Sequence, residues 1–460
     1  MAGGAAVVGA HPHGDLTAAP AAYHGLLEDG SILQESVEGL REGQWARRLV
    51  FGEHPLCISL RPQLVSRARY GAAIAASNAV AGALGALERA LLRDTGLRAE
   101  LDLLPEEERL ALADPGCRHS SPSARIDGFF TDKIRYVEYN AESPAGIAYS
   151  DHLADVFESL PVMRAFRTRF RVRRLPVQRR QVAAMLRAFR EWGREATPTV
   201  AIVDWKGLPT VSEFEMFRDR FAGEGIEAVI CDPMELEYRR GRLYASGKNV
   251  NLVYRRVLTS ELLAKGDEAG ALAAAYLDGA ACVVNTFRAK LLHKKMSLAL
   301  LSDERYASLY TAAQRRAIDD HIPWTRKVRA GPTTHRGRRI DDLADYIARN
   351  RDHLVLKPND EYGGKGVVLG WTVDRHEWER ALEAALTESS VVQEAVPVPR
   401  ETFPVALDGV KFLDLAMDMD PYVFEGRASG CLTRLSSSAL LNVTAGEGSV
   451  VPTFVVEGAR

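Results

Sequence analysis

The stretch Leu354-Val-Leu-Lys-Pro-Asn-Asp-Glu-Tyr-Gly-Gly-Lys-Gly-Val367 combines a short apolar strand with a glycine-rich turn. Its alternation places Val355 and Lys357 on one face of the strand. Pro358 cannot donate a hydrogen bond to a sheet, so we expect the strand to end there. A second apolar strand, 367–371, follows the turn directly. The sequence therefore predicts a β-hairpin with a lysine on its first strand.

The turn of this hairpin contains Gly363, Gly364 and Gly366. Glycine permits the positive φ angles of a tight turn and lets backbone amides approach an anion closely. The spacing is not that of a Walker A loop, which needs glycine at Asn359 and serine or threonine at Gly366. Two interpretations remain open from this stretch alone. The hairpin either folds over a polyphosphate or is an ordinary glycine hairpin with a solvated lysine.

The overall composition is typical of a soluble globular protein with two or three domains. Hydrophobic residues make up 46% and charged residues 26% of the 460 positions. The net charge of −2 argues against a broad nucleic-acid-binding surface. The five cysteines are far apart and include no C-x-x-C pair, which favours free thiols in a reducing compartment over a disulfide framework or a zinc site.

Neither the N-terminal segment nor the apolar run at 74–87 predicts a targeting signal or a membrane span. The N-terminal segment lacks the basic residues of a signal peptide, which indicates a loose tail. The small-residue run from Ile74 to Leu87 is too short to span a bilayer. We therefore expect a cytoplasmic protein with neither membrane nor nucleic-acid partners. No feature of the sequence specifies an oligomeric state.

Periodicity divides the chain into four parts. Residues 1–20 are expected to form the flexible tail, and 21–198 a mainly helical region that also contains a strand at 134–140. Between 199 and 285, strands alternate with helices, which predicts a small α/β domain with a mainly parallel sheet. Residues 286–460 contain the glycine hairpin and several later strands. The predicted fold class is α/β (α+β).

The strand at 134–140 carries polar residues at alternate positions. Period-two alternation would place Tyr136, Glu138 and Asn140 on one face. A carboxylate and an amide oxygen two residues apart are suitable hard ligands for Mg²⁺. An edge strand with a polar outer face is the alternative. The metal-site interpretation is favoured because Val and Tyr on the opposite face suit a strand packed on both sides, where Glu138 would need a partner.

Two further segments contribute polar candidates. The pattern at 287–301 predicts one helix, on which Lys294 and Lys295 are expected to be exposed when no other context is considered. The segment from Ser390 to Pro397 predicts a buried strand that stops at the proline. Its end carries Gln393 and Glu394, so it is a plausible hinge whose backbone and carboxylate meet a nucleobase and ribose.

Taken in order, these motifs resemble those of the circularly permuted ATP-grasp proteins. The similarity is to eukaryotic-type glutathione synthetase and, more loosely, to glutathionylspermidine-synthase-like proteins, and it covers about residues 120–460. The resemblance implies a circularly permuted ATP-grasp fold with a small parallel α/β domain and a helical N-terminal region. It also implies ATP and Mg²⁺ as cofactors.

The resemblance further implies roles for individual residues. It implies that the metal is bound by Glu138, Asn140 and Glu361. It implies that the ATP phosphates are bound by Lys295 and Lys357, with the loop residues Gly363, Gly364, Lys365 and Gly366. It implies that the adenine hinge is formed by Gln393, Glu394 and Val396.

Substrate contacts are implied for Arg125 and Arg434, and for a lid with Gly446 and Gly448. Arg434 would bind a substrate carboxylate through its planar fork. The alternative is that Arg434 is a salt-bridge partner within the protein. The sequence departs from glutathione synthetase at Tyr362, where that enzyme continues with glycine, so the acyl donor need not be γ-glutamylcysteine.

The activity implied by the resemblance is ATP-dependent ligation of a small-molecule or peptide carboxylate to an amine. ATP would phosphorylate the carboxylate and the amine would attack the acyl phosphate, with Arg434, Lys357 and Lys295 as the catalytic residues. Two alternatives remain. The same fold can transfer phosphate to a stable hydroxyl, as a kinase does, or it can bind nucleotide without turnover.

Overall fold

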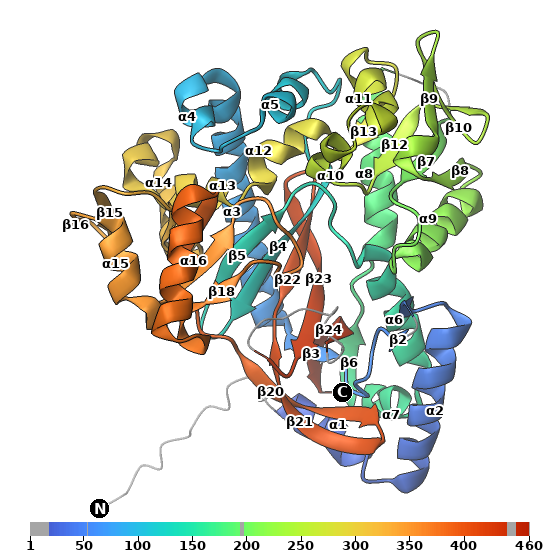
Figure 1. Ribbon diagram of the computed structural model, residues 1–460. Coiled ribbons are helices and arrows are strands. Elements are labelled where there is room, and N and C mark those ends of the chain that lie inside the picture. The colour runs from blue at the N-terminus through green and yellow to red at the C-terminus, as the bar shows by residue number, and fades with distance from the viewer. Residues whose placement is uncertain (1–17, 53, 194–196, 439–447, 460) are drawn as a thin grey trace, which may run out of the picture.

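The computed structural model describes residues 18–52, 54–193, 197–438 and 448–459. It shows a mixed α/β chain built around one large sheet and two four-stranded sheets (Figure 1). Most of the predicted tail, 1–20, lies outside the described residues, and helix α1 (Ala18–Leu26) begins within the remainder. The mixed α/β class predicted from the sequence is confirmed.

The large sheet has nine strands that come from both ends of the chain. Its main path runs β20-β21-β23-β22-β4-β5, and β24 connects β23 to β3 and β6. Every pairing is antiparallel except that of β24 with β3. The strands are β3 (Gln63–Ser66), β4 (Ser123–Phe130), β5 (Ile134–Asn140), β6 (Phe170–Arg173), β20 (Arg400–Leu407), β21 (Gly409–Met417), β22 (Asp420–Phe424), β23 (Arg427–Ser436) and β24 (Ser449–Ala459).

A bulge in β5 corrects the predicted alternation. Asp127 pairs with Glu138, but the next residue of β4, Gly128, pairs with Tyr136, so Val137 is the extra residue. The bulge turns Tyr136 into the core, where its hydroxyl contacts Ser77 at 2.6 Å. Tyr136 therefore does not share a face with Glu138. A β-bulge changes the side on which residues point, and period two cannot reveal it.

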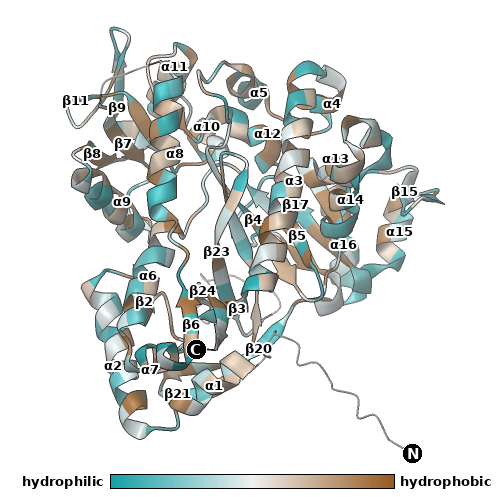
Figure 2. Cartoon of the chain, turned by 180° about the vertical axis from the view of Figure 1, so that it is seen from behind, coloured by the Kyte–Doolittle hydropathy of each residue, from teal (hydrophilic) through white to brown (hydrophobic). Residues whose placement is uncertain are grey.

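Helix α3 (Arg67–Arg93) lies on the rear face of the large sheet, as Figure 2 shows. It extends beyond the apolar run 74–87 and, by length and composition, is long enough to cross a membrane. Its buried side chains instead pack with those of β22, β23 and β24 in one hydrophobic cluster. The position is that of a core helix.

The region 21–198 also contributes shorter helices and a small hairpin. These are α2 (Gly30–Ala46), β1 (Val50–Phe51), β2 (His54–Pro55), α4 (Thr95–Ala99), α5 (Pro105–Leu112), α6 (Ile147–Ser159), α7 (Pro161–Arg169) and α8 (Gln178–Glu191). Although it is mainly helical as predicted, the same region supplies β3, β4, β5 and β6 to the large sheet.

The sheet of the 199–285 segment is parallel throughout, with the order β13-β12-β7-β8. This agrees with the predicted alternation of strands and helices. The elements of the whole segment are β7 (Thr199–Val203), α9 (Val211–Gly223), β8 (Glu227–Cys231), β9 (Leu236–Arg239), β10 (Arg242–Ala245), β11 (Lys248–Val250), β12 (Leu252–Arg255), α10 (Thr259–Ala264), α11 (Gly270–Leu277) and β13 (Cys282–Val284). Strands β9, β10 and β11 form a separate antiparallel sheet. We call this segment the parallel unit.

The glycine hairpin belongs to a second four-stranded sheet, ordered β14-β19-β17-β18. Strands β17 (Leu354–Pro358) and β18 (Val368–Leu369) pair as predicted, although β18 is shorter than 367–371. Trp378 of α16 is fully buried against this sheet. The other elements are α14 (Ala312–His321), β14 (Thr325–Lys327), β15 (Thr333–His335), β16 (Arg338–Ile340), α15 (Leu343–Arg349), α16 (Arg375–Thr387) and β19 (Ser390–Glu394).

The predicted single helix at 287–301 is broken in the middle. It forms α12 (Lys290–His293) and α13 (Met296–Ser302), and Lys294 between them has an extended ψ of 130°. Asn359 occupies the break, since its backbone oxygen accepts from Lys295 N and its side chain from Met296 N. Lys294 and Lys295 are buried rather than exposed as expected, because carboxylates from distant segments pair with them.

Candidate active site

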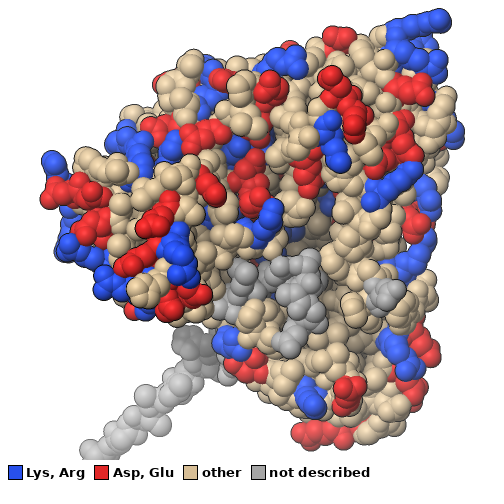
Figure 3. All heavy atoms as spheres, viewed as in Figure 1, with Lys and Arg blue, Asp and Glu red and all other residues tan. Residues whose placement is uncertain are grey.

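A cleft of about 550 Å³ opens where the three sheets approach one another. Figure 3 shows the molecular surface hollowed in this central region. Strand β5 contributes Glu138, β17 contributes Lys357, and the glycine turn closes one side. Asp204 and Arg256, which follow the carboxyl ends of β7 and β12, line the opposite side. Carboxyl ends of parallel strands are a common place for ligands.

Most of the residues predicted for the site line this one cleft. They are Arg125, Glu138, Asn140, Lys295, Lys357, Glu361, Gly363, Gly364, Gln393, Glu394, Val396 and Arg434. Lys365 and Gly366 belong to the same turn, but Lys365 is exposed and pairs with Glu361. Gly446 lies outside the described residues, and Gly448 is described but does not line the cleft.

Lys295 joins the two predicted acidic metal ligands. Its Nζ lies 3.1 Å from Glu138 Oε1 and also donates to the backbone oxygen of Glu361. The Glu361 carboxylate is turned toward Lys365 Nζ, 3.1 Å away. Segments far apart in the sequence therefore meet at one ammonium group.

The charged groups at the centre of the cleft shift one another's pKa values. Burial raises the pKa of the Glu138 carboxyl, but Lys295 and then Lys357 outweigh burial, so the net shift is downward. Burial is also the main influence on Lys357 and lowers its pKa to about 8, although Glu138 partly opposes this. Lys357 Nζ donates to Val137 O at 3.2 Å and Gln393 Oε1 at 2.6 Å. The centre therefore holds an ionised carboxylate between two lysines.

Asn140 is oriented by an aspartate that the sequence interpretation did not include. Its Nδ2 donates to Asp127 Oδ1 at 3.0 Å, which leaves the amide oxygen of Asn140 as its potential ligand atom. Asp127 also accepts two hydrogen bonds from Arg125, at 2.7 and 2.9 Å. Burial opposes ionisation of Asp127, yet Arg125 and Arg434 lower its pKa to about 2.

Arg434 pairs with three aspartates inside the protein. Its Nε lies 2.6 Å from Asp418, and its Nη2 lies 2.8 Å from Asp127 and 3.0 Å from Asp420. Burial, followed by the charges of Asp127 and Asp418, raises the pKa of Asp420 well above its usual value. This arrangement matches the salt-bridge alternative considered for Arg434. A substrate role for Arg434 or Arg125 remains a prediction, since much of each guanidinium already has a partner.

The predicted hinge also has internal partners. Gln393 accepts from Lys357 and donates from Nε2 to Thr325 Oγ1 at 3.0 Å. The Glu394 carboxylate accepts from Arg336 Nη2 at 2.8 and 2.9 Å, although Glu394 also lines the cleft. Val396 lines the cleft. The backbone and apolar side chains at the end of β19 thus remain as contacts for a ligand.

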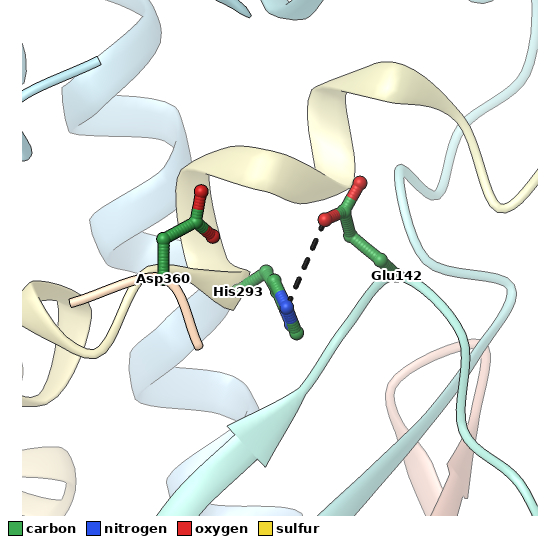
Figure 4. Close-up of side chains that lie close together, drawn as sticks. All are labelled: Glu142, His293 and Asp360. Atoms are coloured by element: carbon green, nitrogen blue, oxygen red, sulfur yellow. Dashed lines mark ion pairs between the residues drawn. The ribbon is translucent and has the colours of Figure 1, made fainter. Parts of the chain in front are cut away.

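A second, buried charge cluster lies beside the cleft, and Figure 4 shows three of its members, Glu142, His293 and Asp360. Ligand atoms of these three lie within 4.8 Å of one another, close enough to share a metal ion. Lys290 Nζ, however, contacts Asp360 Oδ1 at 2.6 Å and Glu142 Oε2 at 3.3 Å. Its ammonium therefore already supplies positive charge at this position.

The remaining members complete the balance of charge in this cluster. Lys294 Nζ lies 2.9 Å from Glu107 and 3.1 Å from Asp360, and Arg255 lies 2.9 Å from Glu142. Burial lowers the pKa of His293 to about 4, although Glu142 opposes the shift, so the imidazole is neutral at neutral pH. The sequence interpretation did not identify this cluster. Asp360 lies within the quoted stretch 354–367 and Glu142 follows the strand at 134–140, but nothing local indicated their burial.

Comparison with known proteins reveals similarity in structure. No protein-family description matches the sequence, and no curated protein matches it. The fold is similar to that of a glutathione synthetase-like effector from Globodera pallida, with a TM-score of 0.59 and 12% identity over 93% of this chain and 98% of that one. A putative gamma-glutamylcysteine synthetase from Methylobacillus flagellatus KT gives a TM-score of 0.42 and 11% identity over 82% and 85% of the two chains.

Proposed function

We propose that the protein is an ATP-dependent carboxylate–amine ligase that works through an acyl phosphate. One observation carries the proposal: Glu138, Lys295, Lys357 and the glycine turn line one cleft although they come from distant segments. These are the residues to which the resemblance to circularly permuted ATP-grasp proteins assigns the metal and the phosphates. The similarity in fold to a glutathione synthetase-like effector supports the same proposal.

The donor set fits a hard divalent cation. Glu138 is ionised, the amide group of Asn140 donates to Asp127 through its nitrogen and so keeps its oxygen available, and Glu361 lines the same cleft. These three residues would hold Mg²⁺ once the Glu361 carboxylate turns from Lys365. When bound, Mg²⁺ would neutralise charge on the phosphate oxygens.

The two cleft lysines would bind the phosphates of ATP. Lys295 is buried and Lys357 is half-buried at the cleft, and fixed charge acts more strongly where water is partly excluded than in bulk water. Lys357, with a pKa of about 8, is mostly protonated at pH 7, and the negative charge of ATP would favour that form further. Binding and orientation of the reactants can supply several kcal/mol of the barrier reduction.

The proposed reaction balances without a protein nucleophile. A substrate carboxylate oxygen attacks the γ-phosphorus, and the bond from this phosphorus to the bridging oxygen breaks to release ADP. The nitrogen of a neutral amine then attacks the acyl carbon, and inorganic phosphate leaves. The proton lost from nitrogen passes to the departing phosphate or to water.

An ADP-release screen over carboxylates, with hydroxylamine as a general amine acceptor, tests this proposal. Formation of a hydroxamate together with ADP is the expected result, because hydroxylamine traps an acyl phosphate. ADP released without an amine, together with a stable phosphorylated product, would identify a kinase. ATP binding without ADP release across the screen would favour a non-catalytic nucleotide-binding protein. Lys357→Ala serves as the control for cleft-dependent turnover.

A further inference from the structure

A tyrosine of the glycine turn reaches across the cleft to the parallel unit. Tyr362 lies between β17 and β18, whereas Glu261 lies in the first turn of α10. The Tyr362 hydroxyl donates to Glu261 Oε1 over 2.9 Å. Both residues line the cleft, so this hydrogen bond connects its two sides.

The acceptor of this hydrogen bond is held firmly. The other carboxylate oxygen of Glu261 accepts from Trp205 Nε1 at 3.2 Å and from the backbone N–H of Leu258 at 3.3 Å. Tyr362 itself is 53% exposed, so its ring has limited packing. The bond to Glu261 is therefore the main polar contact that can set the position of the tyrosine.

The residues on either side of Tyr362 differ in how they are fixed. Before it, Asp360 is bound by two buried lysines, and the backbone oxygen of Glu361 accepts from Lys295. After it, Gly363 has a φ of 62° and no heavy atom within 4 Å of where a Cβ would lie. The turn is thus anchored before Tyr362, whereas the position directly after Tyr362 is open and packing resumes only at Gly366, where a Cβ would lie 2.6 Å from Pro358.

We propose that Tyr362 is a positioning residue that holds the glycine turn over bound nucleotide through Glu261. The inference rests on the proposed function, since the turn is assigned there to the ATP phosphates. The hydrogen bond from Tyr362 to Glu261 would hold the amides of the turn, and the neighbouring carboxylate of Glu361, near the position of the phosphates. Because hydroxyl-to-carboxylate bonds are charge-assisted, losing this one should be measurable even though it is partly exposed.

Tyr362→Phe removes only the hydroxyl, and the chain offers a matched control. Tyr238 also donates to a carboxylate, Asp278 at 2.6 Å, but does not line the cleft. Hydrogen–deuterium exchange of peptide 359–369 should be faster in Tyr362→Phe than in the wild type and unchanged in Tyr238→Phe. The Kd for ATP should rise about three- to tenfold in Tyr362→Phe alone, with kcat at saturating ATP within about twofold.

A double-mutant cycle with Glu261→Gln distinguishes loss of the Tyr362–Glu261 hydrogen bond from general destabilisation. The two changes should be coupled, so that the double variant binds ATP no more weakly than Tyr362→Phe. Wild-type exchange and ATP affinity in Tyr362→Phe would overturn the proposal, as would equal changes in Tyr238→Phe. A wild-type protein that binds no ATP would overturn the proposed function and the nucleotide role of Tyr362. The exchange measurement would still report whether the Tyr362–Glu261 hydrogen bond orders the turn.

Discussion

Two neighbouring charge clusters draw lysines from the same segment but differ in how completely their charges are matched. In the cleft, Lys295 pairs with Glu138, whose side chain is 24% exposed. Behind it, Lys290 is fully buried and contacts Glu142, Asp360 and Glu107. Buried charges must be matched within the protein because desolvation is costly. Charges that reach the cleft can exchange their internal partners for those of a ligand.

The comparison predicts that removing a buried charge affects stability most. Lys290→Met leaves the carboxylates of Glu142 and Asp360 without their shared partner, so unfolding free energy should fall by about 3–5 kcal/mol. Urea denaturation followed by circular dichroism measures this change. A variant as stable as the wild type would contradict the distinction between the clusters. Lys248→Ala, an exposed lysine of the parallel unit, is the control.

Changing the cleft carboxylate should instead affect activity. Glu138→Gln keeps the side-chain shape but removes the charge assigned to the metal, so turnover should fall by about 100-fold or more. Its unfolding free energy should change by less than about 1 kcal/mol, since the site is partly open. Steady-state ADP release and direct Mn²⁺ binding, with Glu361→Gln in parallel, measure the effect. Undiminished Mn²⁺ binding in both variants would remove these residues from the metal site.

Neutralising the cleft lysines should distinguish nucleotides by their phosphates. Lys357→Ala and Lys295→Ala should each weaken ATP binding by about tenfold or more and AMP binding less, because the lost charges face the additional phosphates. Calorimetric titration with both nucleotides measures the difference. Equal weakening of ATP and AMP would place these lysines near the base or indicate misfolding.

The smallest expected effect is a pH dependence from Lys357. Burial lowers its pKa to about 8, so the free protein loses this positive charge as pH rises through that value. The kcat/KM for ATP should therefore decline above about pH 8. The arginine of Lys357→Arg stays protonated throughout this range, so the decline in kcat/KM should disappear in this variant. A profile that is identical in the two proteins would assign the decline to another group.

The same pKa shift of Lys357 predicts that stability changes with pH in the opposite direction from kcat/KM. Its folded-state pKa of about 8 lies below the ordinary value of 10.5, so the unfolded chain binds more protons between these values. The contribution of Lys357 to unfolding free energy should therefore increase as pH rises from 8 toward 10.5. Comparison of urea denaturation in the wild type and Lys357→Met isolates this contribution.

Local patterns in the sequence were sufficient for several elements. The mainly helical character of 21–198, the parallel alternation after residue 199 and the hairpin strand 354–358 all agree with the structure. Periodicity and turn residues reflect interactions between residues that are close in the sequence, and such local interactions largely determine where these elements form. The motif residues that line the cleft were also named from the sequence, through the resemblance rather than through periodicity alone.

The partners of the charged residues were decided only by the tertiary structure. The bulge at Val137 turned Tyr136 into the core, and Asn359 broke the helix predicted across Lys295. Arg434 received its aspartate partners from β4, from β22 and from the turn before β22. Burial and pairing of a charge depend on segments that are distant in the sequence and meet only in the folded chain. Local patterns carry no information about that meeting.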